Sequence, residues 1–155
     1  MIVVRVARGI SEHFPARATE WGFSALMIWL GSLFLQHPAL FDASLSYGGL
    51  AYLADEIVWG WACIVIGALR LVALVVNGTF ADTWYGRWSP HVRGACAFLS
   101  CGIWFPVFAG FLATERPLLI VCYAGVVFGL DAYNIRRVWT DAGRASKAHA
   151  DAAGI

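Results

Sequence analysis

The sequence predicts an all-α fold, a bundle of four transmembrane helices, and three observations lead to it. Hydrophobic residues make up 60% of the 155-residue chain and charged residues only 14%. Soluble domains carry about 45–50% apolar and about 25% charged residues. The apolar residues gather in four blocks. Lysine and arginine are also shared unevenly among the segments that flank these blocks, which gives the predicted bundle a direction in the membrane.

The first block predicts a span over about residues 21–38. It is short, because a helix needs about 20 apolar residues to cross a bilayer. Thr19 is the expected N-cap and Pro38 limits the far end. The alternative is a signal peptide, since three arginines precede the block. A small-residue cleavage site does not follow it, so we expect a retained span.

The next three blocks predict spans over about residues 57–76, 94–113 and 117–134. The second has full length and one interruption, at Arg70. Ser89 and Pro90 form a helix-start signal ahead of the third span. Only the three residues 114–116 separate the third span from the fourth, which predicts an antiparallel helical hairpin.

The basic residues predict that both termini are cytoplasmic. They precede the first span, lie between the second and third, and follow the fourth, whereas the two remaining connections together contain only Arg116. Cytoplasmic connections carry the excess of lysine and arginine. We therefore expect a cytoplasmic arm at residues 1–18, a transmembrane domain at 19–134 and a cytoplasmic tail at 135–155. Apolar residues recur at helical spacing in the tail, which predicts an amphipathic C-terminal helix; they are Ile135, Val138, Trp139 and Ala142.

Two charges lie inside predicted spans, Arg70 in the second and Asp131 in the fourth. A lone charge at mid-bilayer costs about 2.5–3.5 kcal/mol on insertion scales, so it usually has a partner or reaches the headgroups. Both residues fall in the cytoplasmic leaflet, and we expect a structural Arg70–Asp131 pair with Asn77 and Asn134 nearby. Snorkelling of each side chain to the interface is the alternative. A single pair makes a poor proton path, which argues against transport.

Small residues predict close contact between helices. Gly60 and Gly67 are seven residues apart, on one face of the second span. Gly125 and Gly129 form a GxxxG pattern in the fourth, a pattern that supports helix association in membranes. The association can be within one chain or between chains.

The chain lacks the sequence patterns of familiar enzymes and metal sites. Three of the four histidines lie outside the predicted spans and the fourth, His37, lies at the end of the first; the four cysteines lie inside the apolar blocks without a CxxC pattern. Phosphate-binding glycine loops, HExxH and GxSxG are absent from the sequence. We therefore expect a non-enzymatic protein with no catalytic, cofactor or metal site and no nucleic-acid partner.

Two stretches carry a resemblance. These are "GALRLVALVVNGTF" at residues 67–80 and "SPHVRGACAFLSCGIWF" at 89–105, and "DAYNIRR" at 131–137 fits with them. In this order they resemble small membrane proteins of tailed phages and prophages of proteobacteria. The resemblance covers about the second half of the chain and implies a multi-pass protein of the host inner membrane.

Three functions follow from these expectations. The first is a holin-like or otherwise membrane-active phage protein, which would form a homo-oligomer in the lipid bilayer. The second is an accessory or scaffold subunit that binds another membrane protein. The third is a small channel or transporter subunit, suggested by Arg70 and Asp131.

Overall fold

The computed structural model describes residues 2–79, 84–114 and 118–153, with side chains described for Phe14, Lys147 and residues 17–76, 88–114 and 118–143. Within these residues the long helices are α1 (Ile2–Gln36), α4 (Glu56–Thr79), α5 (Trp84–Ala113) and α6 (Leu118–Ala153). Each contains a stretch that is long and apolar enough to cross a membrane, namely Arg17–Gln36, Glu56–Val76, Trp88–Ala113 and Leu118–Gly143. The predicted all-α fold with four such helices is confirmed. By helix length and hydropathy the chain is a multi-pass membrane protein.

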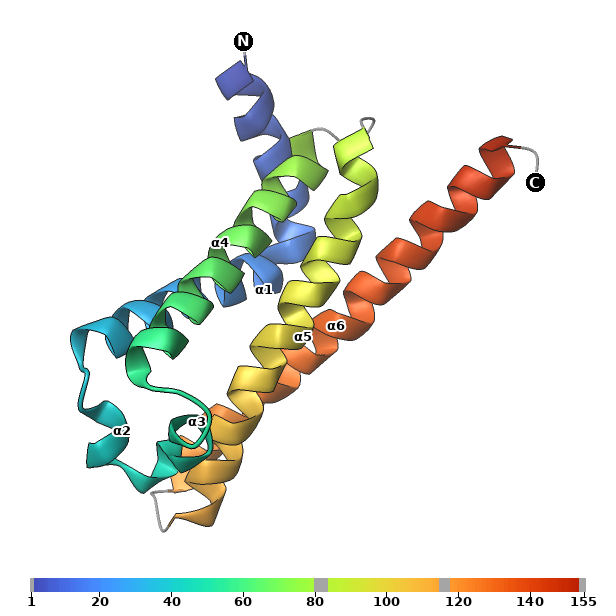
Figure 1. Ribbon diagram of the computed structural model, residues 1–155. Coiled ribbons are helices and arrows are strands. Elements are labelled where there is room, and N and C mark those ends of the chain that lie inside the picture. Colours follow the sequence, from blue (N-terminus) through green and yellow to red (C-terminus); the bar gives the residue numbers. More distant parts are fainter. Residues whose placement is uncertain (1, 80–83, 115–117, 154–155) are drawn as a thin grey trace.

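Successive long helices run in opposite directions (Figure 1). The start of α1, the end of α4, the start of α5 and the end of α6 lie together, and we call this the terminal end of the bundle. The opposite end, which carries the connection between α1 and α4, is the linker end. Helix α1 packs along α4, α4 against α5, and α5 along α6. Toward the terminal end α6 leans away from its neighbours (Figure 1).

Two helices begin well before the predicted spans. Helix α1 continues through residue 19 with a kink at Arg17 (φ −127°, ψ 20°), so the prediction of Thr19 as an N-cap is wrong. The kink lies two residues after Pro15, the residue type most often found at helix kinks. Helix α5 begins at Trp84, so Ser89 does not cap it; the Ser89 hydroxyl donates to the Ala73 carbonyl of α4 at 2.6 Å instead.

Helix α6 runs unbroken through most of the predicted cytoplasmic tail, to Ala153. Its apolar stretch ends at Gly143, nine residues beyond the predicted end of the fourth span. Pro117, the residue at which the fourth span is predicted to begin, lies outside the described residues. The amphipathic character of the tail stays a prediction, because most of its side chains lie outside them too.

The connection between α1 and α4 folds back over the linker end. It contains α2 (Leu40–Ala43), the 3-10 turn η1 (Leu45–Tyr47) and α3 (Gly48–Ala51), of which η1 and α3 pack on α5. The Asp55 carboxylate caps α4 by accepting the Val58 N–H at 2.9 Å. The buried Glu56 carboxylate accepts the Phe41 N–H at 2.8 Å. These contacts give Asp55 a structural partner in the first turn of α4 and Glu56 a partner in the connection.

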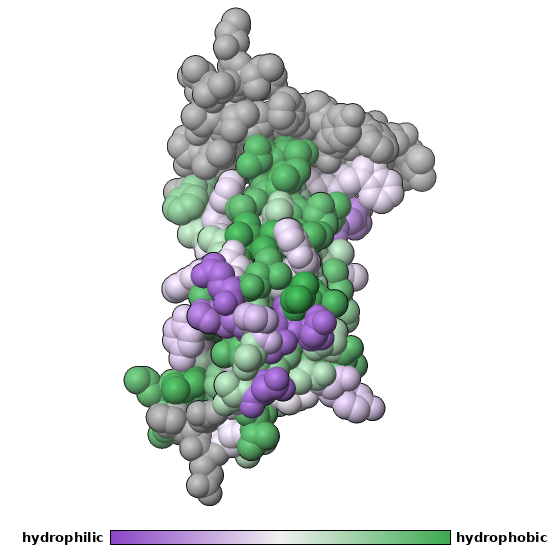
Figure 2. Space-filling view, turned by 60° about the vertical axis from the view of Figure 1, so that its left-hand side comes forward, coloured by the Kyte–Doolittle hydropathy of each residue, from purple (hydrophilic) through white to green (hydrophobic). Residues whose placement is uncertain are grey.

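The apolar core lies toward the linker end and in the middle of the bundle. It consists of Phe23, Met27, Phe34, Phe41, Leu50, Cys63, Ile103, Trp104, Val107 and Val127. Many large apolar side chains also lie on the outside of the bundle. Figure 2 shows one face that is largely hydrophobic, with hydrophilic residues gathered below its middle. An apolar exterior of this kind suits contact with lipid.

Candidate functional site: a buried charge network

The structure brings Arg70 and Asp131 together in the interior of the bundle. Arg70 Nη1 donates to Asp131 Oδ1 at 2.9 Å, and both side chains are completely shielded from solvent. The guanidinium also lies 5.9 Å from the centre of the Phe23 ring, within the range of a cation–π contact. Ser100 of α5 donates its hydroxyl to the other oxygen, Asp131 Oδ2. The carboxylate of α6 therefore joins α4 and α5.

A second buried ion pair joins α1 to α5. Arg93 Nε donates to Glu20 Oε2 at 2.7 Å, and Arg93 Nη2 donates to Glu20 Oε1 at 2.6 Å. Both side chains are fully buried. A two-point contact between guanidinium and carboxylate is the strongest geometry for such a pair and also fixes its direction. This pair is therefore as central to the interior as Arg70 and Asp131.

The Glu20–Arg93 pair is absent from the sequence predictions. The third span is predicted to begin at residue 94, which leaves Arg93 just before it; in the structure α5 begins nine residues before Arg93, at Trp84, so Arg93 lies inside the helix. One signal was available: Glu20 and Arg93 each border an apolar block at the same predicted membrane face. Two opposite charges at one depth on neighbouring helices are candidates for a pair.

Asp141 connects the buried pairs to the surface at the terminal end. Arg93 Nη2 lies 3.4 Å from Asp141 Oδ2, and Arg17 Nη2 lies 3.7 Å from the same oxygen. The side chains of Arg17 and Asp141 are partly exposed. Thr19 donates its hydroxyl to Asn134 Oδ1 at 2.9 Å and so ties α1 to α6. The side chain of Asn77, the other predicted neighbour, lies outside the described residues.

We call these nine residues the polar network: Arg17, Thr19, Glu20, Arg70, Arg93, Ser100, Asp131, Asn134 and Asp141. Its α6 members share one face, and Asp141 comes ten residues after Asp131, which is about 15 Å along the helix. Three guanidinium groups face three carboxylates, so the network is neutral in its formal charge. All four long helices contribute to it. Chemically, the arrangement holds charges in place and leaves none of its carboxylates without a cation.

The polar network contains more donors than acceptors. Among the described side chains, four of its buried donor atoms have no hydrogen-bond partner; they are Arg70 Nε and Nη2, Arg93 Nη1 and Asn134 Nδ2. A buried donor without a partner costs about 1–3 kcal/mol. The attraction within a buried ion pair is often smaller than the free-energy cost of removing both charges from water. Such pairs can be kept because they favour one arrangement of the helices over others. The network therefore contributes more to determining which helices pack together than to the stability of the bundle.

The four glycines predicted to allow close helix packing differ in how closely a neighbouring helix approaches them. A Cβ atom on Gly67 would lie 2.7 Å from the Ser24 carbonyl oxygen of α1, and one on Gly60 would lie 3.0 Å from the Gly31 carbonyl oxygen. These two glycines therefore let the backbones of α1 and α4 approach closely. A Cβ on Gly125 would meet the Phe108 ring, at 3.1 Å, whereas one on Gly129 would have no neighbour within 4 Å.

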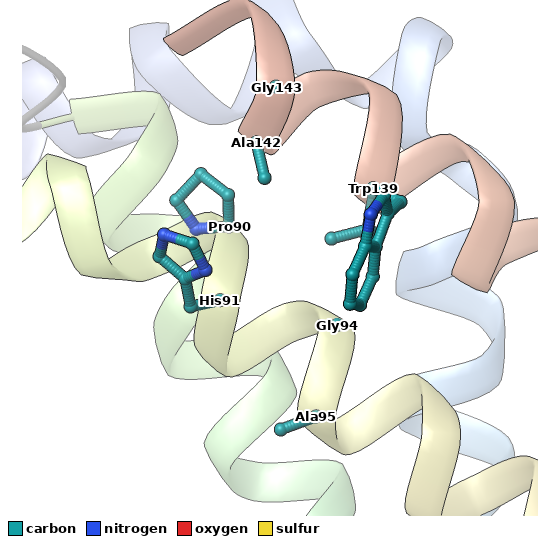
Figure 3. Close-up of a pocket in the computed structure, with 8 residues that line it drawn as sticks. Pro90, His91, Gly94, Ala95, Trp139, Ala142 and Gly143 are labelled. Carbon is teal, nitrogen blue, oxygen red and sulfur yellow. The ribbon is translucent and has the colours of Figure 1, made fainter. Parts of the chain in front are cut away.

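A groove lies between α5 and α6 near the terminal end (Figure 3). Its volume is about 270 Å³, and it is lined by Pro90, His91, Gly94, Ala95, Val138, Trp139, Ala142 and Gly143. The ring of His91 and the indole of Trp139 face each other across it (Figure 3). Groups of three or more His, Cys, Asp and Glu side chains that could hold a metal ion do not occur in the described part of the chain.

A comparison with models of protein families gave no match, and searches of curated proteins and of solved structures gave none. The geometry of the polar network and of the groove is therefore the basis for assigning a function.

Proposed function

We propose that this protein is a non-enzymatic accessory or scaffold subunit that binds another membrane protein. One observation carries the proposal: the charges of the polar network pair with one another within a single chain. Glu20 and Arg93 satisfy each other at two points, and Arg70 meets Asp131. A bundle of this kind holds its shape alone and presents an apolar exterior to lipid or to a partner.

The shape of the interior argues against a channel or transporter subunit. The polar network reaches from the terminal end to Ser100 and Asp131. Between this level and the connection at the linker end, the core consists of apolar side chains, among them Met27, Phe34 and Ile103. A path for ions or protons would need polar groups or water along the remaining length. The apolar half instead separates the polar network from the linker end.

A holin-like role is the second candidate, and the resemblance to phage membrane proteins favours it. A holin-like protein has to assemble in the membrane, and a water-filled opening between its copies would need polar side chains that face water. Here Arg70, Arg93 and their carboxylates are buried against one another. Exposing them would separate both pairs, so the geometry favours the accessory role over the holin-like one.

The proposal includes the bacterial inner membrane as the location and the cytoplasm as the compartment of both termini. The distribution of lysine and arginine supports this orientation, and the start of α1 and the end of α6 both lie at the terminal end (Figure 1). Fusions test it directly. Alkaline phosphatase joined after residue 155 should be inactive in a bacterial host, and green fluorescent protein at the same point should fluoresce. Active phosphatase with dark fluorescent protein would reverse the orientation.

The accessory role is tested by photocrosslinking in cells. One exposed aromatic residue on each long helix is replaced in turn by a photoreactive amino acid, at Trp29, Trp61, Phe98 and Tyr123. A partner that docks on one face should give a discrete protein adduct from one or two of these positions, while the others react only with lipid. Protein adducts from none of them would contradict the accessory role.

The same cells separate the two candidates. Membrane potential and turbidity are followed after tightly controlled induction, with a cytoplasmic peptidoglycan hydrolase present. The accessory role predicts an intact potential and continued growth. Abrupt, timed depolarisation followed by lysis would establish the holin-like role instead.

A further inference from the structure

We propose that the groove between α5 and α6 is a binding site for an anionic phospholipid of the leaflet at the terminal end. The headgroup phosphate and glycerol would lie between His91 and Trp139, and the acyl chains would continue along the seam of α5 and α6. Four features of the groove support this assignment: its depth, its shape, the surface below it and the charges around it.

The depth of the groove matches the headgroup region. Its lining residues on α5 fall in the first two turns of the apolar stretch Trp88–Ala113, and those on α6 fall in the last two turns of Leu118–Gly143. The ends of apolar stretches lie where hydrocarbon gives way to headgroups. Trp139 is also well placed there, because indole rings prefer that level of the bilayer.

The shape of the groove follows from its small residues. Gly94 and Ala95 on α5, with Ala142 and Gly143 on α6, leave the space open where α6 leans away from α5 (Figures 1 and 3). A Cβ on Gly143 would meet nothing within 4 Å. A volume of about 270 Å³ is too small for a whole phospholipid. It suits one polar headgroup with its glycerol, provided that the acyl chains have another surface to follow.

Such a surface runs from the groove toward the linker end. Phe98 and Phe105 come seven and fourteen residues after His91, a spacing that keeps them on the same face of α5. Both phenyl rings are largely exposed. Gly102 lies between them in the sequence, and a Cβ there would also have no neighbour within 4 Å. This part of α5 therefore presents an open apolar track below the groove.

The charges around the groove are complementary to a phosphate. Arg136 and Lys147 are exposed on α6, three residues before and eight residues after Trp139, which places them on its side of the helix. The carboxylate of Asp141 points elsewhere, to Arg93 and Arg17. Basic residues of a transmembrane helix near the headgroup level attract anionic lipids. The imidazole of His91 and the indole N–H of Trp139 add donors on the two walls.

The test uses the full chain in nanodiscs made of equal parts of phosphatidylglycerol and phosphatidylethanolamine. After mild transfer to detergent, native mass spectrometry counts the lipids that remain bound to each chain. Phosphatidylglycerol should remain in clear excess over phosphatidylethanolamine. Gly143→Leu fills the groove and should lower the retained phosphatidylglycerol about tenfold. Gly129→Leu is the matched control, because Gly129 is equally open but lies outside the groove, and it should retain lipid like the parent.

A charge variant tests the choice of headgroup. Arg136→Gln with Lys147→Gln should reduce the preference for phosphatidylglycerol about tenfold, while phosphatidylethanolamine still binds. Equal retention of the two lipids by the parent protein would overturn the proposal. So would unchanged retention by Gly143→Leu, or a protein partner found on the groove in place of lipid.

A second measurement uses the parent protein alone, so the proposal can still be tested if Gly143→Leu fails to fold. Phosphatidylglycerol that carries a photoreactive group in its headgroup is incorporated into the same nanodiscs, and the crosslinked peptides are mapped. Crosslinks should concentrate in residues 88–95 and 138–147. An even distribution over the terminal ends of all four helices would overturn the proposal.

Discussion

The interior of the bundle differs between its two halves. Near the terminal end the helices meet through charged and polar side chains, with Glu20 and Arg93 at the centre. Toward the linker end they meet through apolar and aromatic ones. There the Phe34 and Phe41 rings lie edge to face at 5.3 Å, and the Phe41 and Tyr47 rings are stacked at 5.6 Å. The same four helices are therefore joined by two kinds of contact.

The difference shows what each kind of contact can do in a membrane. Lipid tails are as apolar as leucine, so moving an apolar side chain from lipid into the core gains little. The linker half depends instead on shape: close backbone approach at Gly60 and Gly67, and the folded connection that covers the end. A charged side chain, by contrast, finds no favourable environment among lipid tails. The polar half therefore decides which helices are neighbours, because any other arrangement leaves a charge unpaired.

The largest effect should come from removing one partner of the Glu20–Arg93 pair. Arg93→Met leaves the Glu20 carboxylate fully buried without its cation, which should cost about 3–5 kcal/mol in the free energy of unfolding. The measurement is unfolding of the purified protein from dodecyl maltoside micelles with increasing sodium dodecyl sulfate, followed by circular dichroism.

The double variant Glu20→Met with Arg93→Met is the control. An apolar pair of similar volume is often as stable as a buried ion pair, so the double variant should regain most of the lost stability. If it were as unstable as Arg93→Met alone, the pair would contribute more than mutual neutralisation. The polar half would then differ from the linker half in how strongly its contacts stabilise the bundle, as well as in how they select helix neighbours.

A smaller effect is expected in the linker half and the middle of the bundle, where shape decides. Gly67→Ala places a methyl group 2.7 Å from the Ser24 carbonyl oxygen, so α1 and α4 have to move apart. Overpacking of this kind typically costs about 1–3 kcal/mol. The same detergent unfolding experiment measures it. Gly129→Ala is the matched change in α6, where a Cβ would have no neighbour within 4 Å. It should leave stability unchanged or raise it, since alanine favours helix by about 1 kcal/mol over glycine.

Equal destabilisation by the two alanine variants would contradict this assignment. It would mean that Gly129 also lies in a contact, which the single chain does not contain and an oligomer could supply. Cross-linking of the parent protein in membranes would then decide whether the Gly125–Gly129 pattern joins two copies.

The two halves also differ in how far the sequence predicts them. Arg70 and Asp131 were expected to meet because each stands alone inside a long apolar run, where a partner is needed whatever the packing. Glu20 and Arg93 stand at the borders of such runs, where water is an equally good partner. Their burial depends on α5 beginning at Trp84, and hence on tertiary contacts such as the one from Ser89 to the Ala73 carbonyl.

The linker and the groove were beyond sequence prediction for a related reason. The connection between α1 and α4 has no periodic pattern, and its fold depends on single long-range contacts such as that of the Phe41 N–H with Glu56. The groove exists because α6 leans away from α5, an angle that no local pattern specifies. Helices and their approximate spans follow from hydropathy, whereas their ends and mutual angles follow from packing.

The smallest effect should come from the rim of the polar network, and it separates buried from exposed charge. Asp141→Asn weakens contacts of 3.4 Å with Arg93 and 3.7 Å with Arg17. Because Asp141 is partly open to solvent, the change should cost about 0–1 kcal/mol. Raising the salt concentration from 0.1 M to 1 M shortens the screening length from about 10 Å to about 3 Å, so the difference between variant and parent should shrink. The cost of Arg93→Met should stay nearly constant over the same range, since buried charges are screened far less. A salt-independent loss well above this range for Asp141→Asn would mean that Asp141 is a third essential carboxylate of the polar network rather than part of its exposed rim.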